Sequence, residues 1–380
     1  MDLKKVFTSE SVSEGHPDKL CDQISDAILD ECLRQDENSR VACECYVTTN
    51  HLIIGGEITT KAKIDYKSVA RRVIRDVGYT NKKYGLDADS CRIDVYVKTQ
   101  SLDIARGVDN NGAGDQGIMF GYATNETKGY MPLPIVMAHK LVRVATKLRK
   151  EGKFKWARPD MKSQVSVDYT NPEKPRLLTV VMSVQHDPNY KKREFKNFIK
   201  NEIMIEVAKS FNMNTDFKVE INPTGKFVVG GPKGDVGLTG RKIIVDTYGG
   251  SARHGGGAFS GKDCTKVDRS AAYMARYIAK NLVAAKLCKE CEIQLAYIIG
   301  KEEPASVMVD TKNTNFVDEK TILKAILENF DLTPKGIIKT LDLRKPIYQQ
   351  LATYGHFGRS DIDLPWEKLD KVPVLEKYLH

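Results

Sequence analysis

The alternation of apolar and polar positions predicts one order of elements that recurs along the chain. In the first third, Leu20, Ile24 and Ile28 recur on one face of a helix that opens at Pro17. The elements expected after this helix are strands at 40–48 and 52–59, a helix at 66–77 and a strand at 91–99. The first third therefore reads as helix, strand, strand, helix and strand.

The middle third repeats this order, and the last third repeats most of it. The elements expected in the middle third are a helix at 134–150, strands at 163–169 and 177–185, a helix at 193–210 and a strand at 217–221. Those expected in the last third are a helix at 266–289, strands at 291–299 and 306–310, and a helix at 319–330. The last third shows no closing strand. Coincidence in an ordinary α+β chain is the alternative to a true repeat.

The separation of helices from antiparallel strand pairs favours an α+β fold over a doubly wound sheet. We predict three structurally similar domains, each a mixed sheet with helices, related by pseudo-threefold symmetry. The predicted domains are 1–101, 112–230 and 231–380, and some segments are expected to exchange between them.

Composition narrows the class of protein. Apolar residues make up 41% and charged residues 29% of the 380 residues, as in soluble globular proteins. No apolar stretch approaches the roughly 20 residues that span a bilayer, and the first residues contain no signal-peptide core. We therefore expect a cytoplasmic protein without a membrane partner.

The net charge of +9 is expected to serve small anionic ligands. Basic residues are not interleaved with aromatic ones in a single patch, so no nucleic-acid partner is expected. The eight cysteines form no disulfide framework, which fits a reducing compartment. Cys288 and Cys291 make a single CxxC motif without a partner pair, and we expect no zinc or redox role for it.

The most informative stretch is the glycine-rich run 255–268, GGGAFSGKDCTKVD, directly before a long helical pattern. Its glycines let backbone N–H groups approach a ligand, its lysines suit phosphate oxygens, and its carboxylates suit a divalent ion. Residues Gly256 to Lys262 fit the first seven positions of a P-loop, but Asp263 stands where a P-loop has the magnesium-binding Ser or Thr. The run therefore predicts polyphosphate chemistry of another kind.

The segment 15–19, GHPDK, is short but chemically dense. His16 could donate a proton to a leaving oxygen, Asp18 could ligate magnesium, and Lys19 could reach a phosphate. A capped helix start explains the same residues, because proline and an acid in the first turn suit any helix.

The segment 230–242 carries several glycines before Arg241 and Lys242, and it leads into a strand-like run at 243–246. Flexible glycines beside paired cations favour anion binding over an ordinary surface turn. Nearby, Phe227 could stack on a base or could equally belong to the core.

A third loop, 112–117, matches GxGxxG, the dinucleotide fingerprint. A Rossmann site needs an apolar strand before this motif and a helix after it. Here polar residues precede it, and the run at 118–125 that follows has no clear period. We therefore predict no nicotinamide site.

These segments and several others, in order along the chain, closely resemble S-adenosylmethionine synthetases. The matching motifs are HPDK at 16–19, GGEIT at 55–59, GAGDQG at 112–117, MFGYATNET at 119–127, RPDxKSQV at 158–165, INPTG at 221–225, GLTGRKIIVDTYGG at 237–250, ARHGGGAFSGKD at 252–263, KVDRSAAY at 266–273 and YGHFGR at 354–359. The resemblance runs from about residue 7 to residue 371. A set of long ordered motifs is far more specific than a lone GxGxxG.

The resemblance implies a reaction in two stages. The methionine sulfur attacks the 5′-carbon of ATP and displaces the whole triphosphate, which is hydrolysed to pyrophosphate and phosphate before release. The resemblance also implies two Mg²⁺ ions per site, K⁺, and active sites between the two subunits of dimers that commonly pair into tetramers. A leaving group with several negative charges explains why such a site needs glycines and cations.

The resemblance further implies roles for individual residues. His16 is similar to the group that assists departure of the 5′-oxygen, Asp18 and Asp268 to magnesium ligands, and Glu44 to a potassium ligand. The residues expected to be catalytic are His16, Lys162, Arg241 and Lys262. Those expected to bind ATP are His16, Asp160, Lys162, Lys226, Phe227, Asp235, Arg241, Lys242, Ala258 and Lys262. Those expected to contact methionine are Glu57, Gln100, Asp235 and Lys266.

Two features depart from the family pattern. Cys264 and Thr265 replace the usual Pro-Ser, which frees one φ angle and is expected to loosen the loop around Lys262. The segment 101–111, which includes the family's mobile lid at 102–111, is shorter than in many bacterial relatives. A short lid concerns closure and product release rather than the reaction itself.

Two alternative functions predict different residues. A non-catalytic relative that binds ATP or S-adenosylmethionine as a regulatory subunit would have lost His16, the aspartates or the lysines, and none is lost. A kinase of the P-loop kind would need a hydroxyl where Asp263 stands. The transferase is therefore the predicted function.

Overall fold

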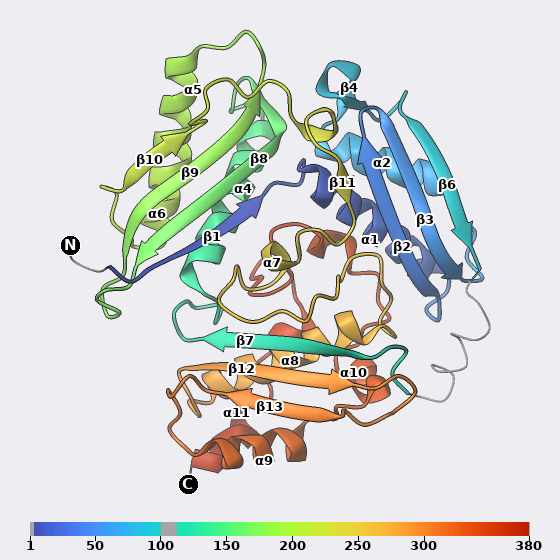
Figure 1. The fold of residues 1–380 in the computed structure, drawn as a ribbon, viewed down its shortest axis with the longest axis vertical. Coiled ribbons are helices and arrows are strands. Elements are labelled where there is room, and N and C mark those ends of the chain that lie inside the picture. The colour runs from blue at the N-terminus through green and yellow to red at the C-terminus, as the bar shows by residue number, and fades with distance from the viewer. Residues whose placement is uncertain (1–3, 100–111, 380) are drawn as a thin grey trace.

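Three β-sheets surround the centre of the molecule in the computed structural model, which describes residues 4–99 and 112–379 (Figure 1). Two of these sheets have four strands and one has three, and a ribbon of β4 (Thr80–Asn81) and β5 (Leu86–Asp87) accompanies them. Helices and mixed sheets are both prominent, so the predicted α+β class is confirmed. No helix in the described ranges is long and apolar enough to cross a membrane.

The elements predicted in the first third are all present. They are α1 (Pro17–Gln35), β2 (Arg40–Thr48), β3 (His51–Thr59), α2 (Tyr66–Val77) and β6 (Arg92–Lys98). β3 pairs antiparallel with β2 and parallel with β6. Leu20, Ile24 and Ile28 are fully buried, as the helical period predicted.

The middle third follows the same order. Its elements are α4 (Leu133–Lys150), β8 (Ala157–Asp168), β9 (Arg176–His186), α5 (Lys192–Phe198), α6 (Glu206–Ser210) and β10 (Lys218–Ile221). A π-helical segment, Ile199–Ile205, joins α5 to α6, so the helix predicted at 193–210 is continuous but changes its hydrogen-bond spacing. β9 pairs antiparallel with β8 and parallel with β10, which repeats the pairing of the first third.

The last third contains the predicted helices and strands, and the largest difference is at the end of the first helix. Its elements are α8 (Val267–Ala284), β12 (Glu290–Tyr297), β13 (Ser306–Asp310), α9 (Glu319–Asn329), α10 (Pro334–Thr340) and α11 (Val372–Leu375). α8 ends five residues before the predicted residue 289, because Lys286 adopts a φ of +59° that a helix cannot continue.

Short 3-10 turns lie at Lys82–Tyr84, Gly231–Lys233, Gln349–Leu351, Pro365–Glu367 and Glu376–Leu379.

Each sheet gains a strand from another part of the chain. β1 (Val6–Val12) pairs antiparallel with β8, β7 (Gly117–Thr124) with β12, and β11 (Gly237–Leu238) with β2. The three sheets therefore share one topology, with the closing strand missing from the third. β7 lies where the sequence showed no clear period, because its successive side chains from Met119 onward are buried on both faces and leave no alternation to detect.

The long helices α1, α4 and α8 each pack against one sheet, toward the middle of the molecule (Figure 1). One apolar core joins the regions around α1 and α8, and a second core lies between α4 and the β8–β9 hairpin. Segments far apart in sequence therefore meet where the sheets converge.

The strand predicted at 243–246 is wrong, because these residues form a helical turn, α7 (Ile243–Asp246). The backbone N–H of Asp246 donates to the carbonyl of Lys242, and Val245 and Asp246 are both buried. A strand would point these two neighbours to opposite faces, whereas the turn lets both face the interior.

Candidate active site

His16 caps the N-terminus of α1. The backbone N–H of Asp18 donates to His16 Nδ1 over 3.2 Å, so the proton of the neutral imidazole lies on Nε2. Burial and the nearby charge of Lys242 lower the pKa of His16 to about 3. The helix-cap interpretation is thus correct, and at neutral pH His16 can offer an Nε2–H hydrogen bond rather than a transferable proton.

Asp18, in the first turn of α1, faces a lysine from a distant loop. Its Oδ1 accepts from the backbone N–H of Leu238 at 3.0 Å, and its Oδ2 accepts from Lys242 Nζ at 2.5 Å. Burial raises the pKa of Asp18, but these bonds outweigh burial and the net pKa is lowered. The side chains of Lys242 and Asp18 are 22% and 9% exposed to solvent, so the pair remains accessible to a ligand.

Strand β8 adds an acid and a base beside this pair. Asp160 is buried, its Oδ2 accepts from the backbone N–H of Gly231 at 2.8 Å, and its Oδ1 has no partner among the described residues. Burial raises the pKa of Asp160 to about 6. Lys162 is exposed, and its charge acts on both Asp160 and His16. The α1 cluster is defined here as His16, Asp18, Asp160, Lys162 and Lys242.

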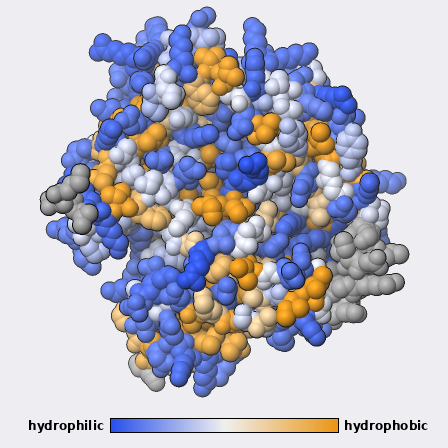
Figure 2. Space-filling view, in the orientation of Figure 1, coloured by the Kyte–Doolittle hydropathy of each residue, from blue (hydrophilic) through white to orange (hydrophobic). Residues whose placement is uncertain are grey.

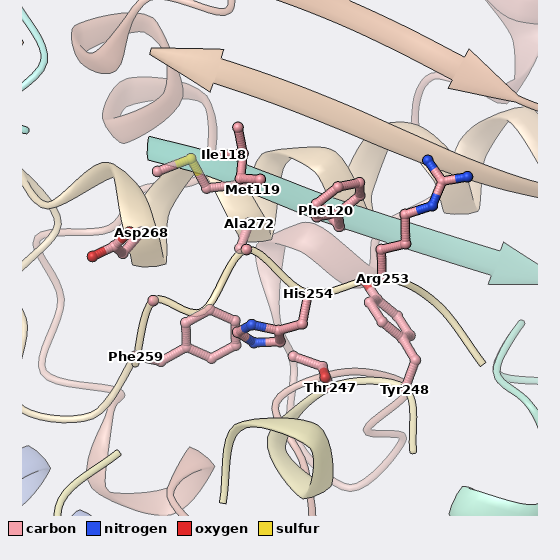
Figure 3. A pocket seen from close by; sticks show the side chains of 12 residues that line it. Ile118, Met119, Phe120, Thr247, Tyr248, Arg253, His254, Phe259, Asp268 and Ala272 are labelled. Carbon is pink, nitrogen blue, oxygen red and sulfur yellow. The ribbon is translucent and has the colours of Figure 1, made fainter. Parts of the chain in front are cut away.

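A second group of charges lies at the N-terminus of α8. Lys262 Nζ donates to Asp268 Oδ2 at 2.5 Å, and their side chains are 26% and 24% exposed. Gly257 makes room for this carboxylate, because a Cβ atom there would lie 2.4 Å from Asp268 Cγ. Asp268 lines a pocket beside β7, and Figure 3 shows it at the same end of that pocket as Phe259. The α8 cluster is defined here as Lys262, Lys266 and Asp268.

Asp263 holds the loop between these residues instead of facing a ligand. It is fully buried and accepts from the backbone N–H of Val41, from the N–H and O–H of Thr265, and from Lys266 Nζ at 2.6 Å. This use of Asp263 explains why the loop does not follow the P-loop pattern. The bonds from Thr265 tie down the turn that the missing proline was expected to loosen, and Cys264 beside it is buried.

Lys19 cannot reach a phosphate, which corrects the prediction made for it. Its side chain is fully buried, and its Nζ donates to Asp22 at 2.8 Å and to Asp246. Burial lowers the pKa of Lys19, but the two carboxylates outweigh burial and raise it. Sequence reasoning missed Asp22 and Asp26. The four-residue spacing of Asp18, Asp22 and Asp26 is the signal that could have revealed them.

The remaining residues predicted to bind ATP lie around the two clusters. Lys226, Asp235 and Arg241 are exposed, and Phe227 is half-buried. Ala258 contacts the loop that carries Arg241 and Lys242, because a Cβ atom at Gly240 would lie 2.5 Å from Ala258 Cβ. The structure thus brings the loops at 230–242 and 255–262 together.

The residues predicted to bind methionine and potassium are more scattered. Glu44 on β2 and Glu57 on β3 are exposed, on the face of their sheet that points away from α1. Lys266 is engaged by Asp263. Gln100 and the predicted lid at 102–111 lie outside the described residues.

No hydrogen bond or ion pair between described residues joins the α1 cluster directly to the α8 cluster. Asp18 pairs with Lys242, and Asp268 pairs with Lys262. The described part of the chain also contains no group of three or more His, Cys, Asp or Glu side chains arranged to hold a metal. Within one chain, the two predicted magnesium ligands therefore belong to separate pairs.

Comparison with known proteins gives a consistent result along the whole chain. Family models of the S-adenosylmethionine synthetase N-terminal, central and C-terminal domains match residues 4–102, 110–227 and 229–368. The S-adenosylmethionine synthases of Mycoplasma capricolum and Mesoplasma florum are each 63% identical over 379 residues, which is 99% of this chain and 97% and 100% of those proteins. That of Finegoldia magna is 52% identical over 392 residues, covering 99% of this chain and 100% of that protein.

Proposed function

The chain belongs to the S-adenosylmethionine synthetase family, and we propose that its α1 and α8 clusters supply the groups of the active site. It is a methionine adenosyltransferase, which synthesises S-adenosylmethionine from ATP and L-methionine. The observation that carries this function is the match of all three family domains, in order, along the chain.

The proposed first step is a displacement at the 5′-carbon of ATP. The methionine sulfur forms a bond to this carbon as the bond to the 5′-oxygen breaks, which leaves a sulfonium product and free triphosphate. His16 carries its proton on Nε2 and stays neutral because of its low pKa. Its N–H donates a hydrogen bond to the departing oxygen, and this bond strengthens as negative charge develops there.

The proposed role of the cations is to hold the triphosphate as it leaves and while water cleaves it to pyrophosphate and phosphate. Lys162 and Lys242 come from the α1 cluster, Arg241 directly precedes Lys242, and Lys262 and Lys266 come from the α8 cluster. In this structure, Lys242 donates to the accessible carboxylate of Asp18, and Lys262 donates to that of Asp268. A polyphosphate offers more negative charge than either carboxylate and competes for the same ammonium groups.

The proposed substrate contacts follow from the unpaired and exposed groups around the clusters. Asp160 Oδ1, buried and without a partner among the described residues, accepts a hydrogen bond from ATP. The half-buried ring of Phe227 stacks on the adenine, and Lys226 and Ala258 complete the ATP contacts. The residues assigned to methionine are Glu57, Gln100, Asp235 and Lys266.

The residues present fit magnesium. Asp18 and Asp268 offer carboxylate oxygens, each beside an ammonium group that already occupies the place of a cation. Mg²⁺ usually takes one or two protein carboxylates and completes its shell with water and substrate phosphates, so a cluster of three protein ligands is not required. We assign one Mg²⁺ to each carboxylate. When bound, the two ions neutralise negative charge on the triphosphate.

Association of subunits is part of the proposal. The α1 and α8 clusters lie in separate ion pairs of one chain, so a complete site would form where the α1 cluster of one subunit faces the α8 cluster of another. Exposed apolar residues include Tyr96 and Ile118, and Figure 2 shows apolar side chains among the hydrophilic ones on one face. Glu44 alone gives K⁺ only a partial site, which a second subunit would complete. We propose a dimer that pairs into a tetramer and resides in the cytoplasm.

One assay tests the reaction. The protein is incubated with ATP, methionine, Mg²⁺ and K⁺, and we expect S-adenosylmethionine, pyrophosphate and phosphate in equal amounts. Absence of S-adenosylmethionine with intact ATP binding would instead favour a regulatory relative. Sedimentation with and without ligands tests the assembly, and a monomer that is fully active would refute the shared site.

A further inference from the structure

Four aspartates of α1 lie along one side of the helix at intervals of four residues. The aspartate ladder is defined here as Asp18, Asp22, Asp26 and Asp30. Four residues are slightly more than one turn, so these side chains follow one another over roughly 18 Å of the helix. All four are buried, with 6%, 0%, 0% and 3% of their surface exposed. Buried carboxylates one turn apart repel each other and lose hydration, so each of them needs a partner.

Each aspartate of the ladder accepts a hydrogen bond from the backbone of a loop far away in sequence. The donors are the N–H groups of Leu238 to Asp18 at 3.0 Å, Gly240 to Asp22 at 2.8 Å, Gly261 to Asp26 at 2.8 Å, and Tyr348 and Gln349 to Asp30 at 2.9 Å. The first three bonds reach the two loops that carry the cations of the α1 and α8 clusters. The bond to Asp30 reaches a loop outside both clusters.

Strand β2 holds the same two loops from the other side. β11 pairs with β2, and the N–H of Thr239 then donates to the carbonyl of Cys45 at 3.1 Å. Further along the same edge, the N–H of Cys43 donates to the carbonyl of Gly261 at 2.9 Å. The two loops therefore follow one another along a single strand edge, enclosed between β2 and the ladder.

The residues held by Asp22 and Asp26 are glycines that cannot be replaced without strain. Gly240 has a φ of +77° and Gly261 a φ of +80°, in the left-handed region. A Cβ atom on Gly261 would lie 1.9 Å from the carbonyl oxygen of Cys43, and one on Gly240 would touch the neighbouring loop. Gly240 precedes Arg241 directly, and Gly261 precedes Lys262 directly. A shift of either glycine is therefore passed to a proposed phosphate-binding cation.

We infer that Asp22 and Asp26 are positioning residues for the transferase reaction: Asp22 fixes the Arg241–Lys242 pair and Asp26 fixes Lys262 along β2, each in the site to which that loop contributes. Neither aspartate contacts the substrate in this scheme. The inference rests on the proposed function, because it takes these cations to bind the polyphosphate. It extends that function to two buried residues outside both clusters.

The test compares Asp22→Asn and Asp26→Asn with a matched control, Asp30→Asn. All three variants keep the size of the side chain, remove a charge from the same side of the same helix, and weaken a bond to a loop. In Asp22→Asn, Lys19 keeps its ion pair with Asp246, so this variant should still fold. In Asp26→Asn, the buried Arg269 loses its carboxylate. If Asp26→Asn fails to fold, Asp22→Asn decides the question.

We expect the KM for ATP and the inhibition constant of added triphosphate to rise about tenfold in Asp22→Asn, because a small misplacement of cations weakens polyphosphate binding. The KM for methionine should stay within about twofold. Asp30→Asn should leave all three constants at the wild-type values, since the loop it holds bears no cluster residue.

Two different failures can be told apart. A wild-type protein that makes no S-adenosylmethionine overturns the proposed function itself. An active wild type in which Asp22→Asn has the kinetic constants of Asp30→Asn, at a temperature where circular dichroism shows both folded, overturns the positioning role. A loss of maximal rate in proportion to the unfolded fraction, with unchanged KM for ATP, also overturns it.

Discussion

Lys242 and Lys19 both donate to aspartates near the start of α1, but only Lys242 keeps contact with solvent. The Lys242 side chain is 22% exposed and faces Asp18, whereas Lys19 is completely buried between Asp22 and Asp246. A buried ammonium group needs carboxylates in direct contact with it, because the loss of its hydration costs free energy. An accessible ammonium group can exchange its carboxylate for a ligand.

The same contrast recurs at α8 between neighbouring residues. Asp268 forms an accessible ion pair with Lys262. Its neighbour Arg269 forms a buried, bidentate ion pair with Asp26, with hydrogen bonds of 2.7 and 2.8 Å. Residue type is alike in the two kinds of pair, so access to solvent separates their roles. Changes at accessible pairs should cost activity, and changes at buried pairs should cost stability, with the positioning effect inferred for Asp22 and Asp26 in addition.

The largest effect is expected for Arg269→Met, which leaves Asp26 without its counter-charge. Removing one partner of a buried pair typically costs about 3–5 kcal/mol of the free energy of unfolding. Urea denaturation followed by circular dichroism measures this loss. A variant as stable as the wild type would contradict the assignment of this pair to the interior framework.

The second effect concerns Asp30, which is buried and, among the described residues, accepts hydrogen bonds from the backbone N–H groups of Tyr348 and Gln349. Burial raises the pKa of Asp30 to about 6 against a usual value of 3.8, so the folded state holds the proton more tightly than the unfolded state. The stability from this group is complete below about pH 3.8 and is lost as the pH rises through about 6, by about 3 kcal/mol at most. Subtracting the Asp30→Asn stability curve from that of the wild type isolates this change. A difference independent of pH would contradict it.

The third effect is expected for His16→Asn. Formation of S-adenosylmethionine should slow about 10²-fold, equivalent to about 2.7 kcal/mol, because the hydrogen bond to the departing oxygen is lost. Asparagine is a good N-cap, so α1 should remain stable. Hydrolysis of added triphosphate should suffer less, and equal losses in both steps would refute the assignment of His16.

The fourth effect is expected for Asp268→Asn, at the accessible pair of the α8 cluster. The Mg²⁺ concentration for half-maximal activity should rise about tenfold, since a neutral amide is a weaker ligand for this ion. The free energy of unfolding should hardly change. An unaltered dependence on Mg²⁺ would remove Asp268 from the metal site.

The smallest effect is expected at an exposed pair remote from both clusters. Arg75 and Asp89 form an ion pair with side chains that are 50% and 74% exposed. Arg75→Ala should change the free energy of unfolding by less than about 1 kcal/mol and leave the activity unchanged. A larger loss of the free energy of unfolding would show that solvent access does not determine how much each ion pair contributes to stability.

Local patterns predicted most elements because periodicity is a local property. The helix from Pro17 and the strands at 40–48 and 52–59 were predicted well, and they are present in the structure. The strands β1, β7 and β11, which join the sheets from other parts of the chain, were missed. Their pairing depends on partners more than 100 residues away, which no window of sequence contains.

The candidate site was predicted as a set of residues rather than as an arrangement. Ordered motifs identified Asp18, Lys242, Lys262 and Asp268, and the structure brings these together in pairs. The role suggested for Lys19 was wrong, because its burial depends on Asp246, which is 227 residues away. Polar positions on a helix usually indicate a solvated face, whereas those of the aspartate ladder point into the protein.

The pairing of strands from distant parts of the chain also affects how the protein is synthesised. The free edge of β2 gains its partner β11 only about 190 residues later, which is on the order of 10–40 s at roughly 5–20 residues per second of translation. Until then its unpaired backbone groups can pair with another nascent chain. Newly made N-terminal segments should therefore need shielding by chaperones until residue 238 has left the ribosome. Ribosomes that stall before this point should yield aggregates rather than a folded first third.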